Sequence, residues 1–144
     1  AMTGHQHNPG TGYTAMGAPA KEIDIPSLVA SLGIEKDHIR VINPNNLKAC
    51  REAVQAAEEA QGPFVIITKA PCALLPEVKK RSANSWFAVD PDTCTGCKAC
   101  LKIGCPAIRM ENKKAVIDKS LCAACGVCYQ VCSFKAISMG RKQQ

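Results

Sequence analysis

The stretch from Cys94 to Cys132 decides how this chain folds. Its first half reads C-T-G-C-K-A-C-L-K-I-G-C-P and carries Cys94, Cys97, Cys100 and Cys105. Its second half reads C-A-A-C-G-V-C-Y-Q-V-C and carries Cys122, Cys125, Cys128 and Cys132. The chain has 10 cysteines, so all but Cys50 and Cys72 lie in this stretch.

Each half presents three cysteines at C-x2-C-x2-C spacing and then a fourth. A [4Fe–4S] cubane has irons facing four directions, and a tight loop reaches only three of them. In bacterial ferredoxins with this run, the fourth cysteine ligates the other cluster. We therefore expect two [4Fe–4S] clusters, one held by Cys94, Cys97, Cys100 and Cys132, the other by Cys105, Cys122, Cys125 and Cys128.

Two other uses of the cysteines fit less well. Zinc sites draw two short-spaced pairs around one ion, which a cysteine triplet matches poorly. A disulfide framework needs an oxidising compartment, and no segment reads as a secretion signal.

The stretch is also an internal repeat. Phe87-Ala88-Val89-Asp90 precedes the first triplet as Ala115-Val116-Ile117-Asp118 precedes the second, and apolar pairs follow each half at Ile108/Met110 and Ile137/Met139. We expect short strands flanking each cluster, in a duplicated α+β ferredoxin domain over residues 82–144. The halves differ mildly: the fourth cysteine follows after four residues in the first and three in the second, and Ser133 replaces Pro106.

Composition limits the choice of function. The 144 residues allow one or two small domains, and the formal charge is +6. Residues 82–144 hold nine Lys/Arg against four Asp/Glu, so the cysteine-rich part is the basic one, at +5. Each oxidised cluster with four thiolates carries about −2, so the cations offset cluster charge or meet an acidic partner rather than nucleic acid. No apolar run approaches the roughly 18 residues of a membrane span.

The first 81 residues predict an α/β domain fragment with a parallel sheet. A loop over residues 1–12 is followed by a helix over 24–33, a strand over 38–43, a helix from Pro44 or Asn45 to about Ala60, and a strand over 64–68. Strand, helix and strand at these lengths form a βαβ unit, and the apolar last strand should be buried on both faces.

Three further features complete the sequence-based picture. Residues 76–86, with Lys79-Lys80-Arg81, read as a solvated linker turn between domains at 1–81 and 82–144. Cys50 and Cys72 read as buried apolar side chains rather than ligands. The three histidines make no metal site by spacing.

The whole chain resembles the large, thiamine-diphosphate-dependent subunit of the indolepyruvate:ferredoxin oxidoreductase family, at its C-terminal end. The resemblance lies in the opening Met2-Thr3-Gly4-His5-Gln6 with Pro9-Gly10-Thr11-Gly12, in the βαβ unit ending Lys69-Ala70-Pro71-Cys72, and in the cysteine stretch through Ile108. The order of parts distinguishes it from the related pyruvate enzymes, because here the thiamine domain precedes the ferredoxin domain on one chain.

The resemblance implies an electron-transfer role in oxidative decarboxylation of aryl 2-oxoacids to acyl-CoA. Thiamine diphosphate and Mg²⁺ act in the intact subunit, where Thr3 and Gly4 line the diphosphate end; the Mg²⁺ motif is expected upstream of Ala1, so the fragment alone should be inactive. Asn8 stands where the family has histidine, so it receives no catalytic role. An apolar shell around the clusters is expected from Ile103, Ile108, Val127, Val131 and Ile137.

The implied partners are the smaller β subunit, coenzyme A, the 2-oxoacid and an external ferredoxin, in the cytoplasm. The alternatives are a ferredoxin-like electron carrier without catalysis of its own, or a subunit of another 2-oxoacid:ferredoxin oxidoreductase.

Overall fold

The computed structural model describes residues 7–141, so the expected thiamine-diphosphate residues Thr3 and Gly4 lie outside the described part. The chain forms two compact units, Ala1–Leu74 and Leu75–Gln144. Each unit is described by itself below.

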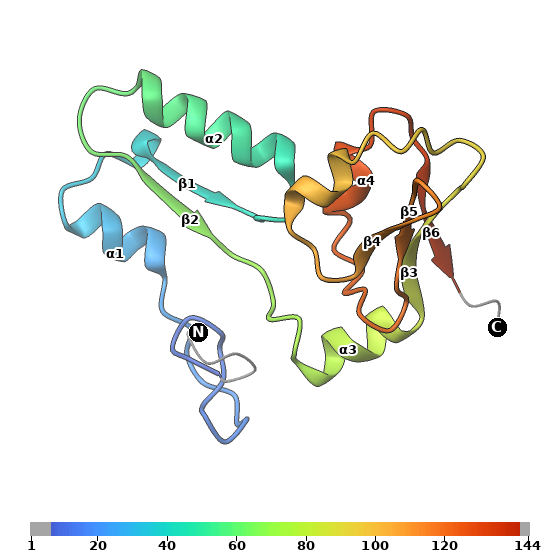
Figure 1. Ribbon diagram of the computed structural model, residues 1–144. Helices are drawn as coiled ribbons and strands as arrows, with labels where there is room; N and C mark the ends of the chain where they lie inside the picture. Colours follow the sequence, from blue (N-terminus) through green and yellow to red (C-terminus); the bar gives the residue numbers. More distant parts are fainter. Residues whose placement is uncertain (1–6, 142–144) are drawn as a thin grey trace. The chain divides into compact units, whose positions relative to one another are not determined.

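The first unit is a βαβ unit preceded by a short helix, as the sequence predicts. It contains α1 (Ile25–Ser31), a 3-10 turn η1 (Lys36–His38), β1 (Ile39–Ile42), α2 (Leu47–Glu59) and β2 (Val65–Thr68). The two strands pair in parallel, with Ile39 opposite Val65. Figure 1 shows α1 and α2 on opposite sides of this strand pair.

Side chains at the helix starts explain where the two helices begin. Asp24 caps α1 by accepting from the Ser27 backbone N–H, and Pro26 occupies the first turn. The helix α2 begins later than predicted, at Leu47, because Asn46 accepts from the Ala49 N–H as its cap. The preceding residues form a turn in which the Asn43 side chain accepts from the Asn45 N–H at 2.9 Å.

The prediction that the last strand of this unit is buried on both faces is wrong for the described residues. Val65, Ile66 and Ile67 are half-buried, and Thr68 is exposed. Among the described residues β1 is the one strand that pairs with β2, whereas a parallel strand buried on both faces needs a wider sheet.

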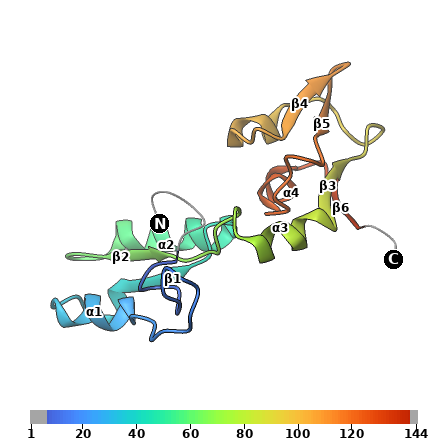
Figure 2. The same cartoon turned by 90° about the horizontal axis from the view of Figure 1, so that it is seen from below.

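The second unit consists of two separate antiparallel strand pairs with short helical segments (Figure 2). Its elements are α3 (Pro76–Ala83), β3 (Ser85–Val89), the 3-10 helix η2 (Ala99–Ile103), β4 (Ile108–Glu111), β5 (Lys114–Ile117), α4 (Val127–Val131) and β6 (Ile137–Arg141). Strand β3 pairs with β6, and β4 pairs with β5. The strands expected on either side of each cysteine triplet are confirmed.

The two halves of this unit follow one plan. Val89 lies opposite Ile137 in the first pair, as Ile117 lies opposite Ile108 in the second. Just beyond these residues, the Asp90 N–H donates to Ala136 O at 2.8 Å, and the Asp118 N–H donates to Ala107 O at 2.8 Å. The sequence repeat is therefore a repeat of backbone pairing, in which the strand before each triplet pairs with the strand after the other one.

The stretch expected to be a solvated linker turn is a helix instead. Helix α3 spans Pro76–Ala83 and buries Val78, while Lys79 and Lys80 stay exposed. Proline at its first position fits a helix start, and a buried valine beside exposed lysines gives the stretch an apolar and a polar side, as in a surface helix. The compact units divide before this helix, between Leu74 and Leu75.

The core of the second unit is built largely from cysteines and small residues. Its buried members are Phe87, Cys94, Cys100, Ile108, Ala115, Cys128, Ala136 and Ile137. Few of these side chains are large. Fully burying one aliphatic side chain such as Ile137 stabilises the fold by roughly 1.5–3 kcal/mol. Among the residues that the structure describes, no helix is both long and apolar enough to cross a bilayer.

Candidate [4Fe–4S] cluster sites

The first cavity brings together four cysteines from both halves of the repeat. Cys94, Cys97 and Cys100 come from the loop between β3 and η2, and Cys132 follows α4. They line a hollow whose other walls include Val89, Ala115 and Ile137.

The second cavity repeats this arrangement with the halves exchanged. Cys122, Cys125 and Cys128 come from the loop leading into α4, and Cys105 follows η2 of the first half. They line a second hollow, whose other walls include Phe87, Ile103 and Val127. The eight cysteines of the stretch thus line two hollows, four at each; that each four ligate one cluster stays a prediction.

The second and third cysteines of each triplet differ in burial in the same way at both cavities. The third cysteine of each triplet, Cys100 or Cys128, is buried. The middle cysteine, Cys97 or Cys125, is exposed. Each cavity is therefore closed toward the core and open at the middle cysteine.

Left-handed backbone lets both loops curl around their cavities. Gly96 and Lys98 have φ of 72° and 63°, and their counterparts Ala124 and Gly126 have φ of 52° and 78°. Gly96 also lies against the chain, because a Cβ there would be 2.2 Å from the carbonyl oxygen of Lys113. Only glycine meets both conditions at position 96.

Backbone N–H groups point at the first sulfur of each triplet. The Phe87 N–H donates to Cys122 Sγ at 3.5 Å. Hydrogen bonds from the backbone of Ala115 and then Gly96 lower the pKa of Cys94, with the Lys114 ammonium adding to the effect. These donors stabilise the thiolate, which is the form that ligates metal.

Burial acts in the opposite direction on the third sulfur. It raises the pKa of Cys100, where the nearby thiols of Cys94, Cys97 and Cys132 add to the rise. At Cys128 burial raises the pKa to about 11, with neighbouring thiols contributing further. Four sulfurs that repel one another as anions in an apolar hollow fit a cationic iron core, which compensates their charges.

The residues at both hollows fit [4Fe–4S] clusters. Four thiols converge at each, and the walls are otherwise mainly apolar. Of the expected shell, Ile137 lines the first hollow, Ile103, Ile108 and Val127 line the second, and Val131 packs against the core between the halves. Sequence reasoning missed the N–H donors of Phe87 and Ala115, although their repeated place before each triplet was a usable signal.

The remaining cysteines lie outside both cavities. Cys50 is half-buried on α2, and its Sγ lies 3.6 Å from Pro44 O. Cys72 is half-buried as well. The expectation of fully buried apolar side chains is therefore only partly met. The one His-containing group of ligand-type side chains among the described residues, Glu35, Asp37 and His38, has two exposed carboxylates.

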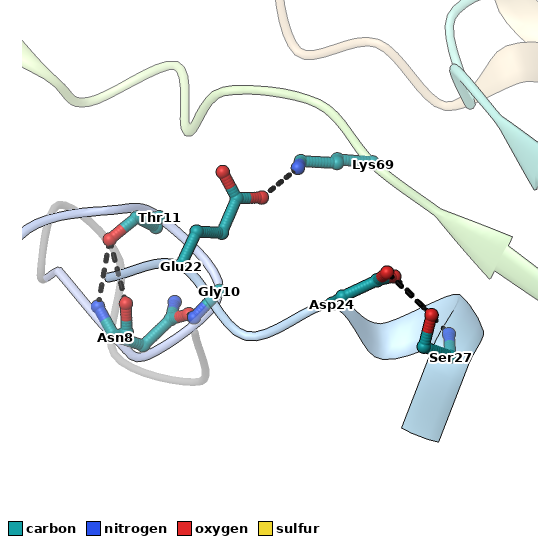
Figure 3. A network of polar contacts seen from close by, with 7 residues as sticks. All are labelled: Asn8, Gly10, Thr11, Glu22, Asp24, Ser27 and Lys69. Carbon is teal, nitrogen blue, oxygen red and sulfur yellow. Dashed lines mark hydrogen bonds and ion pairs between the residues drawn. The ribbon is translucent and has the colours of Figure 1, made fainter. Parts of the chain in front are cut away.

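The glycine-rich loop near the start of the first unit is held by its own hydrogen bonds (Figure 3). Asn8 Oδ1 accepts from the Gly10 N–H at 3.0 Å, and Thr11 Oγ1 donates to Asn8 O at 2.8 Å. Glu22, after this loop, pairs with Lys69 at the end of β2. Asn8 therefore shapes the turn.

Comparison with known proteins agrees with this geometry. Residues 87–133 match the family described as "4Fe-4S dicluster domain", so the second unit contains a domain of the kind that holds two [4Fe–4S] clusters.

Nearly the whole chain is similar to a much longer protein. It is 40% identical over 148 aligned positions to "Indolepyruvate oxidoreductase subunit IorA" of Pyrococcus abyssi, covering 99% of this chain. It is 41% identical over 143 positions to the protein of the same name from Thermococcus kodakarensis, covering 94% of this chain. The chain spans 22% of the length of each of these relatives.

Proposed function

We propose that this chain, similar along nearly its whole length to IorA subunits, is the electron-transfer portion of an indolepyruvate:ferredoxin oxidoreductase. The enzyme would convert indolepyruvate or related aryl 2-oxoacids and coenzyme A to acyl-CoA. Electrons from that oxidation would pass through the two clusters of this chain to a ferredoxin.

The observation that carries the proposal is the pair of four-cysteine hollows. Each joins a triplet from one half to a fourth cysteine from the other, which supports Cys94, Cys97, Cys100 and Cys132 as one ligand set and Cys105, Cys122, Cys125 and Cys128 as the other. A [4Fe–4S] cluster accepts and releases one electron at a time, so two clusters suit a two-electron oxidation.

The chain's own residues would hold the clusters and set their environment. Apolar walls exclude water, and N–H groups such as that of Phe87 donate to ligand sulfur; both are recognised influences on cluster potential. The exposed Cys97 and Cys125 leave one edge of each hollow accessible to a partner.

The first unit would complete a thiamine-diphosphate domain in the intact subunit. Thiamine diphosphate supplies the electron sink that makes the 2-oxoacid carbon reactive. Thr3 and Gly4 are proposed near its diphosphate, with Mg²⁺ bound by residues upstream of Ala1. A smaller β subunit would complete the cytoplasmic enzyme.

The test uses the chain as it stands, reconstituted with iron and sulfide without oxygen. We expect about eight irons and eight sulfides per chain. A colourless product holding two zinc ions would overturn the cluster assignment.

A second measurement separates the enzyme from a plain electron carrier. The full-length subunit, co-expressed with its smaller partner, should reduce its clusters on addition of indolepyruvate and coenzyme A, and this chain alone should not. Clusters that stay oxidised in the complete enzyme with indolepyruvate, phenylpyruvate and pyruvate alike would leave the carrier interpretation standing. Saturable thiamine-diphosphate binding by this chain alone would show that the proposed site is misplaced.

A further inference from the structure

We infer that electrons leave this domain from the first cluster, beside Cys97, across a lysine-rich surface that receives an acidic electron-carrier protein. This inference rests on the proposed function and adds the exit cluster and the docking surface. The surface, called here the exit surface, is defined by Lys98, Lys113, Lys114 and Lys135.

Each of these lysines has a definite place at the first cavity. Lys98 lines it, and the Lys113 carbonyl lies against Gly96 of its loop. The Lys114 ammonium donates to the carbonyl oxygen of Cys94. Lys135 stands between two residues that line the cavity, Phe134 and Ala136.

The repeat supplies an internal comparison, because every lysine of the exit surface has an uncharged counterpart at the second cavity. The matched backbone bonds of Asp90 and Asp118 fix the alignment of the halves. It sets Lys98, Lys113 and Lys114 against Gly126, Ser85 and Trp86. Counted back from the matched Ala136 and Ala107, it sets Lys135 against Pro106, because the second half has two more residues after its fourth cysteine. The shared plan of two cluster loops therefore does not require these charges.

Other charges near the two loops do not cancel the difference. Asp90 and Asp118 are equivalent, so they add equally to both sides, and Arg109, which lies 3.7 Å from Asp118, is offset by Glu111, with which it also pairs. The first loop has one further acid, Asp92, and the second has one further cation, Lys119, whose ammonium lies 4.4 Å from the centre of the Trp86 ring. These side chains give the first loop a net charge of +3 from four lysines and one aspartate, against +1 from Lys119 at the second.

Three of the lysines also have a left-handed backbone conformation, which is unfavourable for lysine. Lys98, Lys113 and Lys135 have φ of 63°, 65° and 54°. A left-handed conformation costs roughly 1–2 kcal/mol for a residue other than glycine, and asparagine or glycine would fit it better. All three side chains belong to exposed residues, so packing does not explain lysine there.

The second cavity opens on a different surface. Between Ser120 and Phe134 the sequence has no charged residue, and Leu121 and Tyr129 are 58% and 53% exposed. An acidic protein would gain less attraction there than at the exit surface. Cationic groups near a cluster also favour its reduced, more negative form and so raise its reduction potential. The first cluster is therefore expected to be the last to hold the electron inside the domain.

The experiment removes the charge of the exit surface without disturbing its backbone. In the triple variant Lys98→Asn, Lys113→Asn and Lys135→Asn, asparagine tolerates the left-handed conformation. The reconstituted, pre-reduced chain is mixed in a stopped-flow instrument with an acidic bacterial two-[4Fe–4S] ferredoxin at rising salt. Electrostatic steering raises association rates by about 10- to 1,000-fold, so we expect the low-salt rate constant to fall at least about 10-fold and its salt dependence to flatten.

A matched control removes as many cations from the same unit. Lys80→Gln, Arg109→Gln and Lys119→Gln change exposed residues that do not line the first cavity. We expect less than about a threefold change in rate. Equal losses in both triple variants, or none in either, would overturn the exit surface. Should the asparagine variant fail to assemble, Lys98→Gly with Lys135→Gly removes two of the three charges, and glycine suits position 98 because Gly126 occupies the equivalent position.

Two other readouts separate this inference from the proposed function. Iron content and methyl viologen reduction should match the unmodified chain in every variant, because the small cation needs no basic docking surface. In a redox titration followed by electron paramagnetic resonance, the more easily reduced cluster should shift to lower potential in the exit-surface variant alone. A chain that holds both clusters but shows neither the rate change nor this shift refutes the exit surface and leaves the electron-transfer function intact.

Discussion

The backbone N–H of Phe87 donates to the sulfur of Cys122 over 3.5 Å, so a strand of the first half supports a ligand-type sulfur of the second. Ala115, at the equivalent place in the second half, donates its N–H to Cys94 of the first. The halves therefore exchange hydrogen-bond donors as well as the fourth cysteine of each cavity. Neither cavity is complete without residues from both.

Changing Cys132 to Ala should damage the cluster of the first triplet. Cys132 lies with that triplet at the first cavity although it follows α4. We expect iron to fall from about eight to about four per chain, because one cubane loses a ligand. Alkylation of the reconstituted variant, read by mass spectrometry, should label Cys94, Cys97 and Cys100 and spare the second triplet.

The control for this experiment is Cys72→Ala, which changes a cysteine outside both cavities and should leave the iron content unchanged. Labelling of Cys122, Cys125 and Cys128 in the Cys132→Ala variant would mean that each half holds its own cluster.

Cysteine spacing carried the prediction of this domain a long way, because a metal cluster demands ligands at fixed separations. It predicted the strand before each triplet, found as β3 and β5, and the strand after each half, found as β4 and β6. Which strand pairs with which was not predictable in the same way. The pairing of Val89 with Ile137 joins residues far apart in the sequence, and periodicity reports only local structure.

The local composition led to a wrong prediction for the stretch before the cysteine-rich domain. The basic run Lys79-Lys80-Arg81 suggested a solvated turn, but Val78 is buried and the stretch is helical. The observed start of α2 differs from the predicted one because three asparagines and a proline precede the helix and several of them could cap it. Hydrogen-bond geometry shows that Asn46 is the cap.

Gly96→Ala and Ala124→Gly form a matched pair at equivalent positions of the two loops. Alanine at 96 combines a φ of 72° with a Cβ 2.2 Å from Lys113 O, so the loop must move. We expect the visible absorbance of the first cluster to bleach at least about 10-fold faster in the presence of a chelator, corresponding to strain above roughly 1.4 kcal/mol.

Glycine at 124 should have a much smaller effect. Ala124 already holds a φ of 52°, and glycine relieves that strain while it adds chain entropy to the unfolded state. We expect bleaching within about threefold of the unmodified chain, either way. Similar bleaching of both variants would show that the first loop does not need its glycine.

Gly140→Ala should displace the single tryptophan of the chain. Gly140 lies opposite Trp86, and a Cβ there would come within 2.8 Å of the indole ring. Movement of the ring would also break its contact with the Lys119 ammonium. We expect a shift in tryptophan emission. We also expect a lower melting temperature, because overpacking should reduce the free energy of unfolding by about 1–3 kcal/mol. Ser138→Ala on the same strand is the control, and an unchanged emission spectrum in Gly140→Ala would contradict the tight packing.

The last prediction concerns the thiols of the cluster-free chain as the pH rises. Cys128 and Cys94 are both buried, yet burial raises the pKa of Cys128 to about 11, while N–H donors lower the pKa of Cys94 from its ordinary value of 9.0. Because the folded chain holds the Cys128 proton more tightly than the unfolded chain, its stabilising contribution is complete below about pH 9 and is lost as the pH rises toward 11. Alkylation followed by mass spectrometry at each pH should modify Cys94 first and Cys128 only near the upper end, and unfolding by denaturant should become easier over the same interval. Equal labelling of the two cysteines at every pH would show that the folded environment does not distinguish them. Restored stability above pH 9 in Cys128→Ser, whose hydroxyl does not titrate there, would assign the loss to this thiol.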